Sequence, residues 1–169
     1  MHFLIHDASV LIDLINGGLL DEVLRLSYIM ETTDFVRREI TDPDQRIVLE
    51  SCISDGKLSV IYSVADHIPK IVEIQREFAK LSISDCSVIY FAGSQNGIII
   101  SGDKILRNAA KSKKLEVHGT LWAMDQLVEK GLIGPTYARD RLLAMIQKNN
   151  RLPRQQCESL IEKWRKLGG

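Results

Sequence analysis

Apolar residues along the chain follow two alternating patterns, short continuous runs and longer stretches with helical spacing. Short runs bounded by polar residues are typical of buried strands, and they occur at 2–6, 27–32, 58–62, 98–100 and 116–118. Between them, apolar residues recur every three or four positions. This spacing predicts helices over 10–15, 19–26, 35–40, 43–55, 65–81, 85–92, 105–113 and 121–128.

The alternation of strands and helices over residues 2–131 favours parallel strands joined by right-handed crossovers, and hence an α/β sandwich with about five strands. Two further helical stretches are expected at 137–149 and 155–167. We therefore expect a main α/β unit over 1–134 and a helical extension over 135–169 that packs on the same domain.

Polar residues ahead of several helical stretches predict where those helices begin. Ser9 and Ser84 are expected to cap the helices that follow them, and Thr120 the helix at 121–128. Asp42 followed by Pro43 is a further start signal, because proline is well suited to the first helical turn.

The composition limits the classes of function. Lys plus Arg and Asp plus Glu both number 22, so a nucleic-acid role needs local basic patches. The three cysteines are far apart and form no CxxC pair, which indicates neither a disulfide framework nor a zinc site and fits a reducing compartment. We expect a cytoplasmic protein without a membrane partner, since the sequence shows no signal peptide and no apolar run of membrane-spanning length.

Four acidic residues are candidates for one site. Asp7 and Asp103 each follow a predicted parallel strand, and Asp85 opens the helix that precedes the strand at 98–100. Glu39 joins them if its helix follows closely on the strand at 27–32. The carboxyl ends of neighbouring parallel strands meet at one sheet edge, where open α/β sheets usually bind ligands. Each acid also has a structural alternative, as a helix cap, a first-turn residue, a turn residue or a solvated surface acid.

Clustered carboxylates predict a bound cation. Two of them about 5 Å apart repel each other by roughly 3 kcal/mol at an effective dielectric near 20. Oxygen-only ligation selects a hard ion, Mg²⁺ or Mn²⁺, and such an ion can activate water and stabilise charge on a phosphoryl group. Phosphodiester hydrolysis is therefore the chemistry that the acids favour.

These acids in their local sequences resemble those of PIN domains over residues 2–133: Asp7 within 3–9, Glu39 within 36–40, Asp85 within 84–89 and Asp103 within 101–104. The resemblance implies a Rossmann-like, five-stranded parallel sheet and a metal-dependent nuclease, with these four acids as catalytic and metal-binding residues and Ser9 supporting them. Small members are commonly VapC-type toxins that cleave RNA, so an RNA substrate, an antitoxin partner and a homodimer are also implied. The segments 119–121 and 130–133 resemble a subfamily of predicted nucleic-acid-binding PIN proteins.

Other residues leave alternatives open. Lys104, Arg107, Arg37 and Arg38 could contact a phosphate backbone or could simply form solvated helix faces. Trp122 is expected to pack in the interior. A non-catalytic PIN-fold module that binds nucleic acid or protein is the alternative to a nuclease, and a metal-dependent phosphatase or DNA nuclease on a similar sheet is a third possibility.

Overall fold

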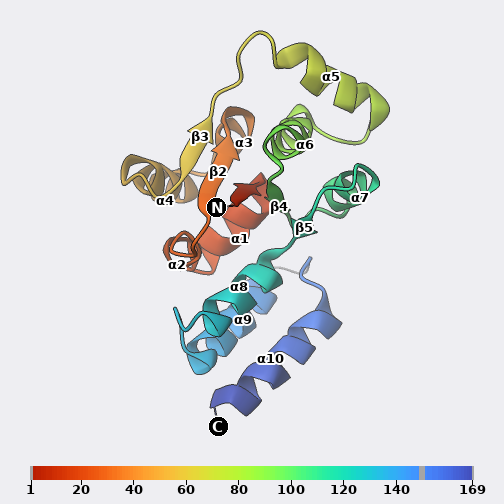
Figure 1. The fold of residues 1–169 in the computed structure, drawn as a ribbon. Coiled ribbons are helices and arrows are strands. Elements are labelled where there is room, and N and C mark those ends of the chain that lie inside the picture. The colour runs from red at the N-terminus through yellow and green to blue at the C-terminus, as the bar shows by residue number, and fades with distance from the viewer. Residues whose placement is uncertain (1, 149–150, 169) are drawn as a thin grey trace.

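A parallel five-stranded sheet forms the centre of the computed structural model, which describes residues 2–148 and 151–168 (Figure 1). The strand order is β3-β2-β1-β4-β5, and the strands are β1 (Phe3–His6), β2 (Ile29–Thr33), β3 (Ser59–Ile61), β4 (Ile98–Ile100) and β5 (Val117–His118). Every neighbouring pair is parallel. This arrangement confirms the predicted α/β fold with a Rossmann-like sheet.

The chain reverses its direction across the sheet between β1 and β4. From β1 it proceeds outward to β2 and β3, and it then returns to β4 on the other side of β1 before continuing to β5. A crevice at the carboxyl ends of two such strands is where open α/β sheets bind their ligands. The fold therefore directs attention to the residues that follow β1 and β4.

Helices connect all the strands, and one more helix directly follows the last strand. They are α1 (Ala8–Asn16), α2 (Leu20–Val23), α3 (Asp34–Glu39), α4 (Pro43–Ser54), α5 (Ile68–Glu77), α6 (Ile83–Gln95), α7 (Lys104–Ser112) and α8 (Thr120–Glu129). Helix α6 packs against β1, β2 and β4, whereas α1 contacts α2, α3, α4 and α8. Strand β4 consists of three isoleucines, and all three are buried.

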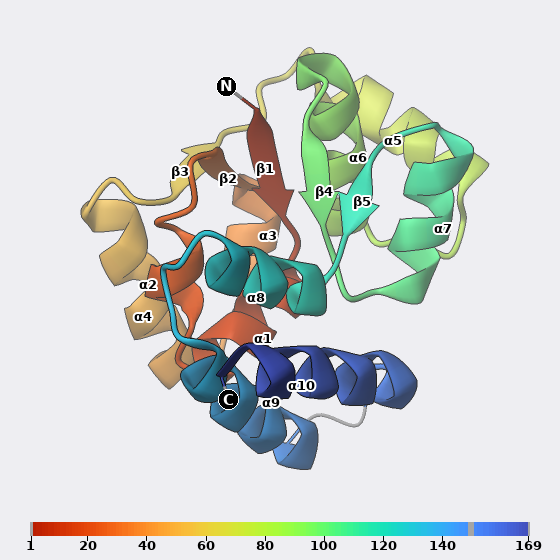
Figure 2. The same cartoon turned by 60° about the horizontal axis from the view of Figure 1, so that its bottom comes forward.

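The C-terminal extension is a pair of helices, α9 (Pro135–Lys148) and α10 (Arg154–Gly168), that pack on each other and on α8 (Figure 2). Trp164 of α10 is 1% exposed, and its indole N–H donates to Asp125 of α8 at 3.0 Å. Met145 of α9 lies against Gly17, where an added Cβ would be only 2.6 Å from the methionine sulfur. The extension is thus docked on the α/β unit by close packing.

Several helix starts differ from the sequence predictions. Asp7, not Ser9, caps α1 and accepts the Val10 amide at 3.0 Å. Ser82, not Ser84, caps α6, because its hydroxyl and the Asp85 carboxylate form a reciprocal capping box.

Other element bounds also differ. Gly119 rather than Thr120 is the cap of α8. Helix α5 is shorter than the predicted 65–81, because Pro69 lies in its first turn and Phe78 leaves the helical conformation. The end expected at 149 for α9 lies outside the described residues. Among the helices that the structure describes, none is long and apolar enough to cross a membrane.

Candidate functional site

Asp7 lies at the carboxyl end of β1 and is 3% exposed. Its backbone N–H donates to the carbonyl of Ile100 at 3.0 Å, which ties the end of β1 to the end of β4. Its carboxylate accepts the Ser9 hydroxyl at 2.9 Å, the Val10 amide at 3.0 Å and the Ser101 hydroxyl at 2.5 Å. These donors hold a buried carboxylate in a fixed orientation at the topological switch point.

Ser101 joins Asp7 to Asp103. Its hydroxyl donates to Asp7 Oδ2 and accepts the backbone N–H of Asp103 at 3.0 Å. Ser9 makes a second link, since its hydroxyl accepts the N–H of Gly102 at 3.0 Å. Asp103 itself caps α7 by accepting the Leu106 amide at 2.8 Å. The structure therefore brings the acids that follow β1 and β4 to one edge of the sheet.

The pKa of Asp7 reports an unfavourable environment for its negative charge. Burial raises this pKa from 3.8 to about 6, against the opposing effect of the hydrogen bonds from Ser101, Val10 and Ser9. The negative charge of Asp85 raises the pKa further, which means that the two carboxylates are close enough to repel each other. This edge of the sheet is thus acidic in the metal-free protein.

Asp85 lies in the first turn of α6 and is half-buried. Its Oδ2 atom accepts both the backbone N–H and the hydroxyl of Ser82, at 2.9 Å and 2.8 Å. Glu39, the last residue of α3, is exposed, and within the described residues no hydrogen bond connects it to the other three acids. Of the four candidate acids, three are thus linked by hydrogen bonds or by charge, and Glu39 is not.

The acids that cap helices or lie in a first helical turn still have carboxylate oxygens that could bind a metal ion. In the part of the chain that the structure describes, Asp85 Oδ1 and Asp103 Oδ2 accept no hydrogen bond, and Asp7, Asp85 and Asp103 form no ion pair. Over the same ranges, no three acidic, histidine or cysteine side chains stand close enough together to hold a metal ion as they are. The oxygen donors suit a hard cation in chemistry, although their present spacing is wider than a closed ion site.

A cleft of about 830 Å³ opens beside Asp103. Its floor includes Ser9, Ser101 and Gly102, and its walls come from α7, from the start of α8 and from the connection between α9 and α10. Asp13 of α1 also lines it; this buried acid accepts the Thr120 hydroxyl at 3.4 Å. The cleft therefore extends from the candidate acids towards the C-terminal helices.

Sequence reasoning did not single out Ser101 or Asp13. Ser101 directly follows β4 and stands level with Asp7, because His6 is in register with Ile100. Asp13 is an acid within an otherwise apolar helical stretch, which is a signal that the sequence does contain. Both positions could have been found by asking which polar residues flank or interrupt the apolar runs at this sheet edge.

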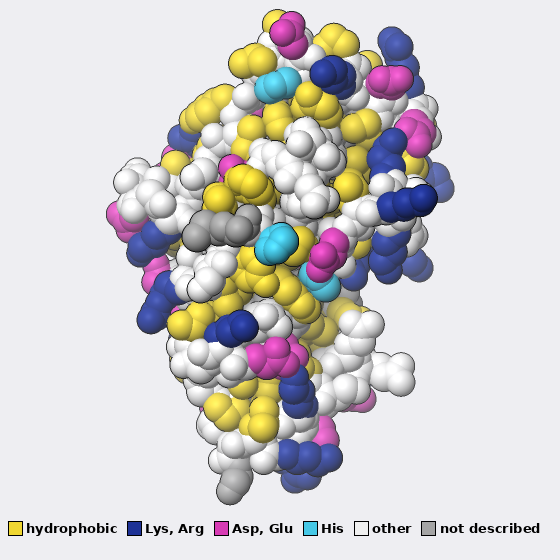
Figure 3. Space-filling model, viewed as in Figure 1, with side chains coloured by type: hydrophobic (Ala, Val, Ile, Leu, Met, Phe, Trp, Pro, Cys, Tyr) yellow, Lys and Arg dark blue, Asp and Glu magenta, His cyan; other side chains and the backbone are white. Residues whose placement is uncertain are grey.

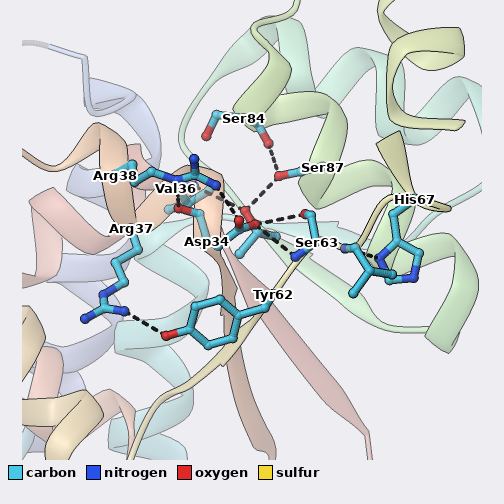
Figure 4. Close-up of polar contacts among 11 residues, drawn as sticks. Asp34, Val36, Arg37, Arg38, Tyr62, Ser63, His67, Ser84 and Ser87 are labelled. Atoms are coloured by element: carbon cyan, nitrogen blue, oxygen red, sulfur yellow. Dashed lines mark hydrogen bonds and ion pairs between the residues drawn. The ribbon is translucent and has the colours of Figure 1, made fainter. Parts of the chain in front are cut away.

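A second polar network lies at the carboxyl ends of β2 and β3 (Figure 4). Asp34, buried at the start of α3, accepts the Ser63 hydroxyl at 2.9 Å and pairs with Arg38. The Thr33 hydroxyl lies 2.7 Å from that of Ser87 on α6. These contacts fasten α3 to β3 and α6, so they explain Asp34 as a structural residue.

The four candidate cations are placed differently. Arg37 donates to the Tyr62 hydroxyl at 2.8 Å (Figure 4). It also forms a bidentate pair with Glu50 at 2.6–2.9 Å, so it is engaged within the fold. Arg38 pairs with the acid at the start of its own helix. Lys104 and Arg107 line the cleft beside Asp103, within a group of basic side chains over α7 (Figure 3).

The fold and this sheet edge define a Rossmann-like α/β protein with an acidic site at the switch point. A family model, DUF3368, described as a PIN domain, matches residues 3–166. The chain therefore belongs to the PIN-domain family, and its fold is of a nuclease type. The match runs through α9 and most of α10, so the C-terminal helices lie within the family's domain.

A solved structure of similar fold is that of PAE2754 from Pyrobaculum aerophilum, with a TM-score of 0.56 and 15% sequence identity. The similarity covers 76% of this chain and 98% of that one, and at this identity it concerns the fold alone. A search of curated proteins found no match.

Proposed function

We propose that this protein is a divalent-metal-dependent endoribonuclease that hydrolyses RNA phosphodiester bonds, with Asp7, Asp85, Asp103 and Glu39 as its catalytic and metal-binding acids. The observation that supports this most strongly is the environment of Asp7. A buried carboxylate with a raised pKa, close to a second carboxylate and without an ion pair among the described residues, is an arrangement that a cation would stabilise.

The donor set fits Mg²⁺ or Mn²⁺. The acids offer only oxygen, which these hard ions prefer, and two of the three linked acids keep a carboxylate oxygen that accepts no hydrogen bond among the described residues. When bound, such an ion supplies a nucleophilic water at neutral pH and neutralises charge on the phosphoryl oxygens.

The chain's own residues have distinct tasks in this proposal. Ser9 and Ser101 orient the Asp7 carboxylate through their hydroxyls. The Ser101 hydroxyl also accepts a hydrogen bond from the backbone N–H of Asp103, so this serine fixes the position of Asp103 relative to Asp7. Gly102 lets the chain pass close to Ser9, because an added Cβ would stand only 3.3 Å from the serine oxygen. Lys104 and Arg107 offer positive charge to the RNA backbone beside the acids.

Cleavage of single-stranded RNA tests the proposal. With Mg²⁺ or Mn²⁺ the wild type should cleave, Asp7→Asn and Asp85→Asn should lose most of the activity, and Asp34→Asn should retain it, because Asp34 belongs to the structural network. Equal cleavage by wild type and both site variants would refute the assignment. A parallel panel with single-stranded DNA and a phosphomonoester separates the endoribonuclease from the DNA nuclease and the phosphatase.

The biological role that we propose is that of a toxin of a toxin–antitoxin module, acting on cellular RNA and held inactive by a partner protein. This step is supported by the sequence resemblance to small PIN toxins. Induced expression of the wild type in a bacterial host should arrest growth, whereas expression of Asp7→Asn should not. Growth at equal rates, with both proteins soluble and equally abundant, would contradict the toxin role and leave the nuclease proposal to the cleavage assay.

A non-catalytic binding module is the second candidate, and one observation favours it. No three candidate ligands among the described residues stand close enough to share an ion. Calorimetric titration with Mn²⁺ discriminates between the two functions: absence of binding up to millimolar concentration would favour the binding module, and binding that Asp7→Asn removes would favour the nuclease.

A further inference from the structure

Three cationic side chains occupy one face of α7 along the cleft. Lys104, Arg107 and Lys111 have the i, i+3, i+7 spacing of a single helix face, and all three line the cleft beside Asp103. Arg107 is held in place, since its Nη1 atom donates to the Ser101 carbonyl at 2.9 Å. In a chain with zero formal net charge, this local row gives the cleft a positive wall beside Asp103.

Stacked rings form another part of the cleft lining. The imidazole of His118, at the end of β5, lies parallel to the indole of Trp122 on α8, with ring centroids 4.2 Å apart and planes inclined by 12°. Both side chains are half-buried and line the same cleft as the α7 cations. Trp122 packs against the core, as expected, and its remaining surface lines the cleft.

We propose that this cleft is the binding path for single-stranded RNA, in which the phosphates contact Lys104, Arg107 and Lys111 and an unpaired base stacks on the His118–Trp122 pair. This inference rests on the proposed nuclease function, because it takes the Asp103 end of the cleft as the place of reaction. It adds the residues that would position the single strand, which are the three cations of α7 and the His118–Trp122 pair.

The combination of charge and rings favours a single strand. Aromatic side chains recognise unpaired bases by stacking, whereas the bases of a duplex already stack on their neighbours. A volume of about 830 Å³ is within the range that encloses small ligands, so the cleft takes roughly one or two nucleotides. Asp103 lines this cleft together with the α7 cations, so the proposed phosphate contacts lie beside one of the candidate acids.

Tryptophan fluorescence can report this binding without cleavage. The chain has two tryptophans, and Trp164 is buried at 1% exposure in the C-terminal extension, so Trp122 should respond to RNA while Trp164 serves as an internal reference. The wild type is titrated in EDTA with a short oligouridylate and with a blunt RNA duplex. Quenching and tighter binding are expected for the single strand.

Variants identify the contacts. Trp122→Leu keeps apolar bulk but has no aromatic ring, so it should remove the quenching and weaken binding roughly 5- to 150-fold, as expected for the loss of one stacked base. Trp122→Phe keeps a ring and should retain most of the affinity. Lys111→Ala should reduce the slope of log affinity against log salt by about 0.7, as expected for one lost phosphate contact. Lys130→Ala, at the end of α8 and outside the cleft lining, is the matched control and should leave the slope unchanged.

The results separate this inference from the nuclease proposal. Wild-type affinity in either Trp122→Leu or Lys111→Ala, or tighter binding of the duplex, would overturn the cleft as the RNA path even if RNA is cleaved. Binding that follows the expected pattern, combined with no cleavage in Mg²⁺ or Mn²⁺, would instead refute the nuclease. Circular dichroism and the Trp164 emission of each variant establish that the fold is intact.

Discussion

Replacing Asp7 by asparagine should stabilise the metal-free protein, because burial makes its negative charge costly. The rise of its pKa from 3.8 to about 6 corresponds to about 3 kcal/mol of unfolding free energy, at roughly 1.4 kcal/mol per pH unit. Asparagine cannot accept hydrogen bonds from all of Ser9, Ser101 and the Val10 amide in the same way, and one lost hydrogen bond costs about 1 kcal/mol. The net gain should be about 2 kcal/mol.

The gain has a defined dependence on pH. Folded Asp7 binds its proton more tightly than the unfolded chain does, so the cost of its charge is fully present above about pH 6. This cost is relieved as the pH falls through 6 towards 3.8, because the folded carboxyl takes up its proton first. The advantage of Asp7→Asn over the wild type should therefore be largest near neutral pH and should disappear near pH 4.

Urea unfolding in EDTA, followed by far-ultraviolet circular dichroism near neutral pH and near pH 4, measures both effects. In thermal unfolding, 2 kcal/mol should raise the Tm by roughly 4–8 °C for a chain of this size. Asp34→Asn is the matched control: Asp34 is also buried, but it pairs with Arg38, so its replacement should give no gain. Equal or lower stability of Asp7→Asn near neutral pH, or a gain that does not change with pH, would refute the reasoning.

Three further changes test other parts of the molecule. Burial lowers the pKa of His6 from 6.5 to about 4, so at mildly acidic pH the unfolded chain binds a proton that the folded protein does not. Between about pH 7.5 and 5, the unfolding free energy of the wild type in urea should therefore fall by about 2 kcal/mol relative to that of His6→Leu. Equal pH slopes for the two proteins would contradict this. Gly17→Ala should lower the unfolding free energy by about 1–3 kcal/mol, because the added methyl group crowds Met145. In a Met145→Ala background most of this loss should disappear, whereas additive losses in the double mutant would argue against the contact. Ser101→Ala removes a hydrogen bond that lowers the pKa of Asp7, so kcat/KM for RNA cleavage should fall. The acidic limb of the pH profile of kcat/KM should also move to higher pH. An unchanged acidic limb would show that Ser101 does not affect the pKa of Asp7.

The sheet could be predicted from the sequence because its central strands β1 and β4 are apolar and largely buried. The run Ile98–Ile100 carries no polar residue, as parallel strands covered by helices require, and the polar residues on either side of it mark its ends. Chain order then places the residues after β1 and β4 at the same edge. The meeting of Asp7 and Asp103 therefore follows from the alternation of strands and helices alone.

Helix starts were less predictable, because neighbouring polar residues compete for the same role. Both Ser82 and Ser84 come shortly before Asp85 in the sequence, and local sequence alone would let either one cap the helix that contains Asp85. The structure uses Ser82, whose spacing of three residues from Asp85 permits the reciprocal capping box, whereas Ser84 is buried in the first turn. Local sequence offers both choices, and tertiary burial decides between them.

Side-chain contacts across the site depend on tertiary packing and could not be read from spacing. The link from Asp7 to Asp103 passes through Ser101, whose polar character is unremarkable in the sequence. The cleft likewise depends on where α8 and the C-terminal helices dock. The spacing of apolar residues in those segments predicts that they are helices, but it does not predict which surface the helices cover. The contact between Met145 and Gly17 is one example of packing that the spacing does not predict.

The central claim is that Asp7, at the carboxyl end of β1, holds a divalent ion together with Asp103 after β4, with Asp85 at the start of α6, or with both. The most direct measurement is a crystal structure of the wild type grown with Mn²⁺, with the ion located by its anomalous scattering. We predict a peak at roughly 2 Å from carboxylate oxygens of Asp7 and at least one of Asp85 and Asp103, where ions of this kind bind. A map in which these carboxylates carry no peak at saturating Mn²⁺ would contradict the account.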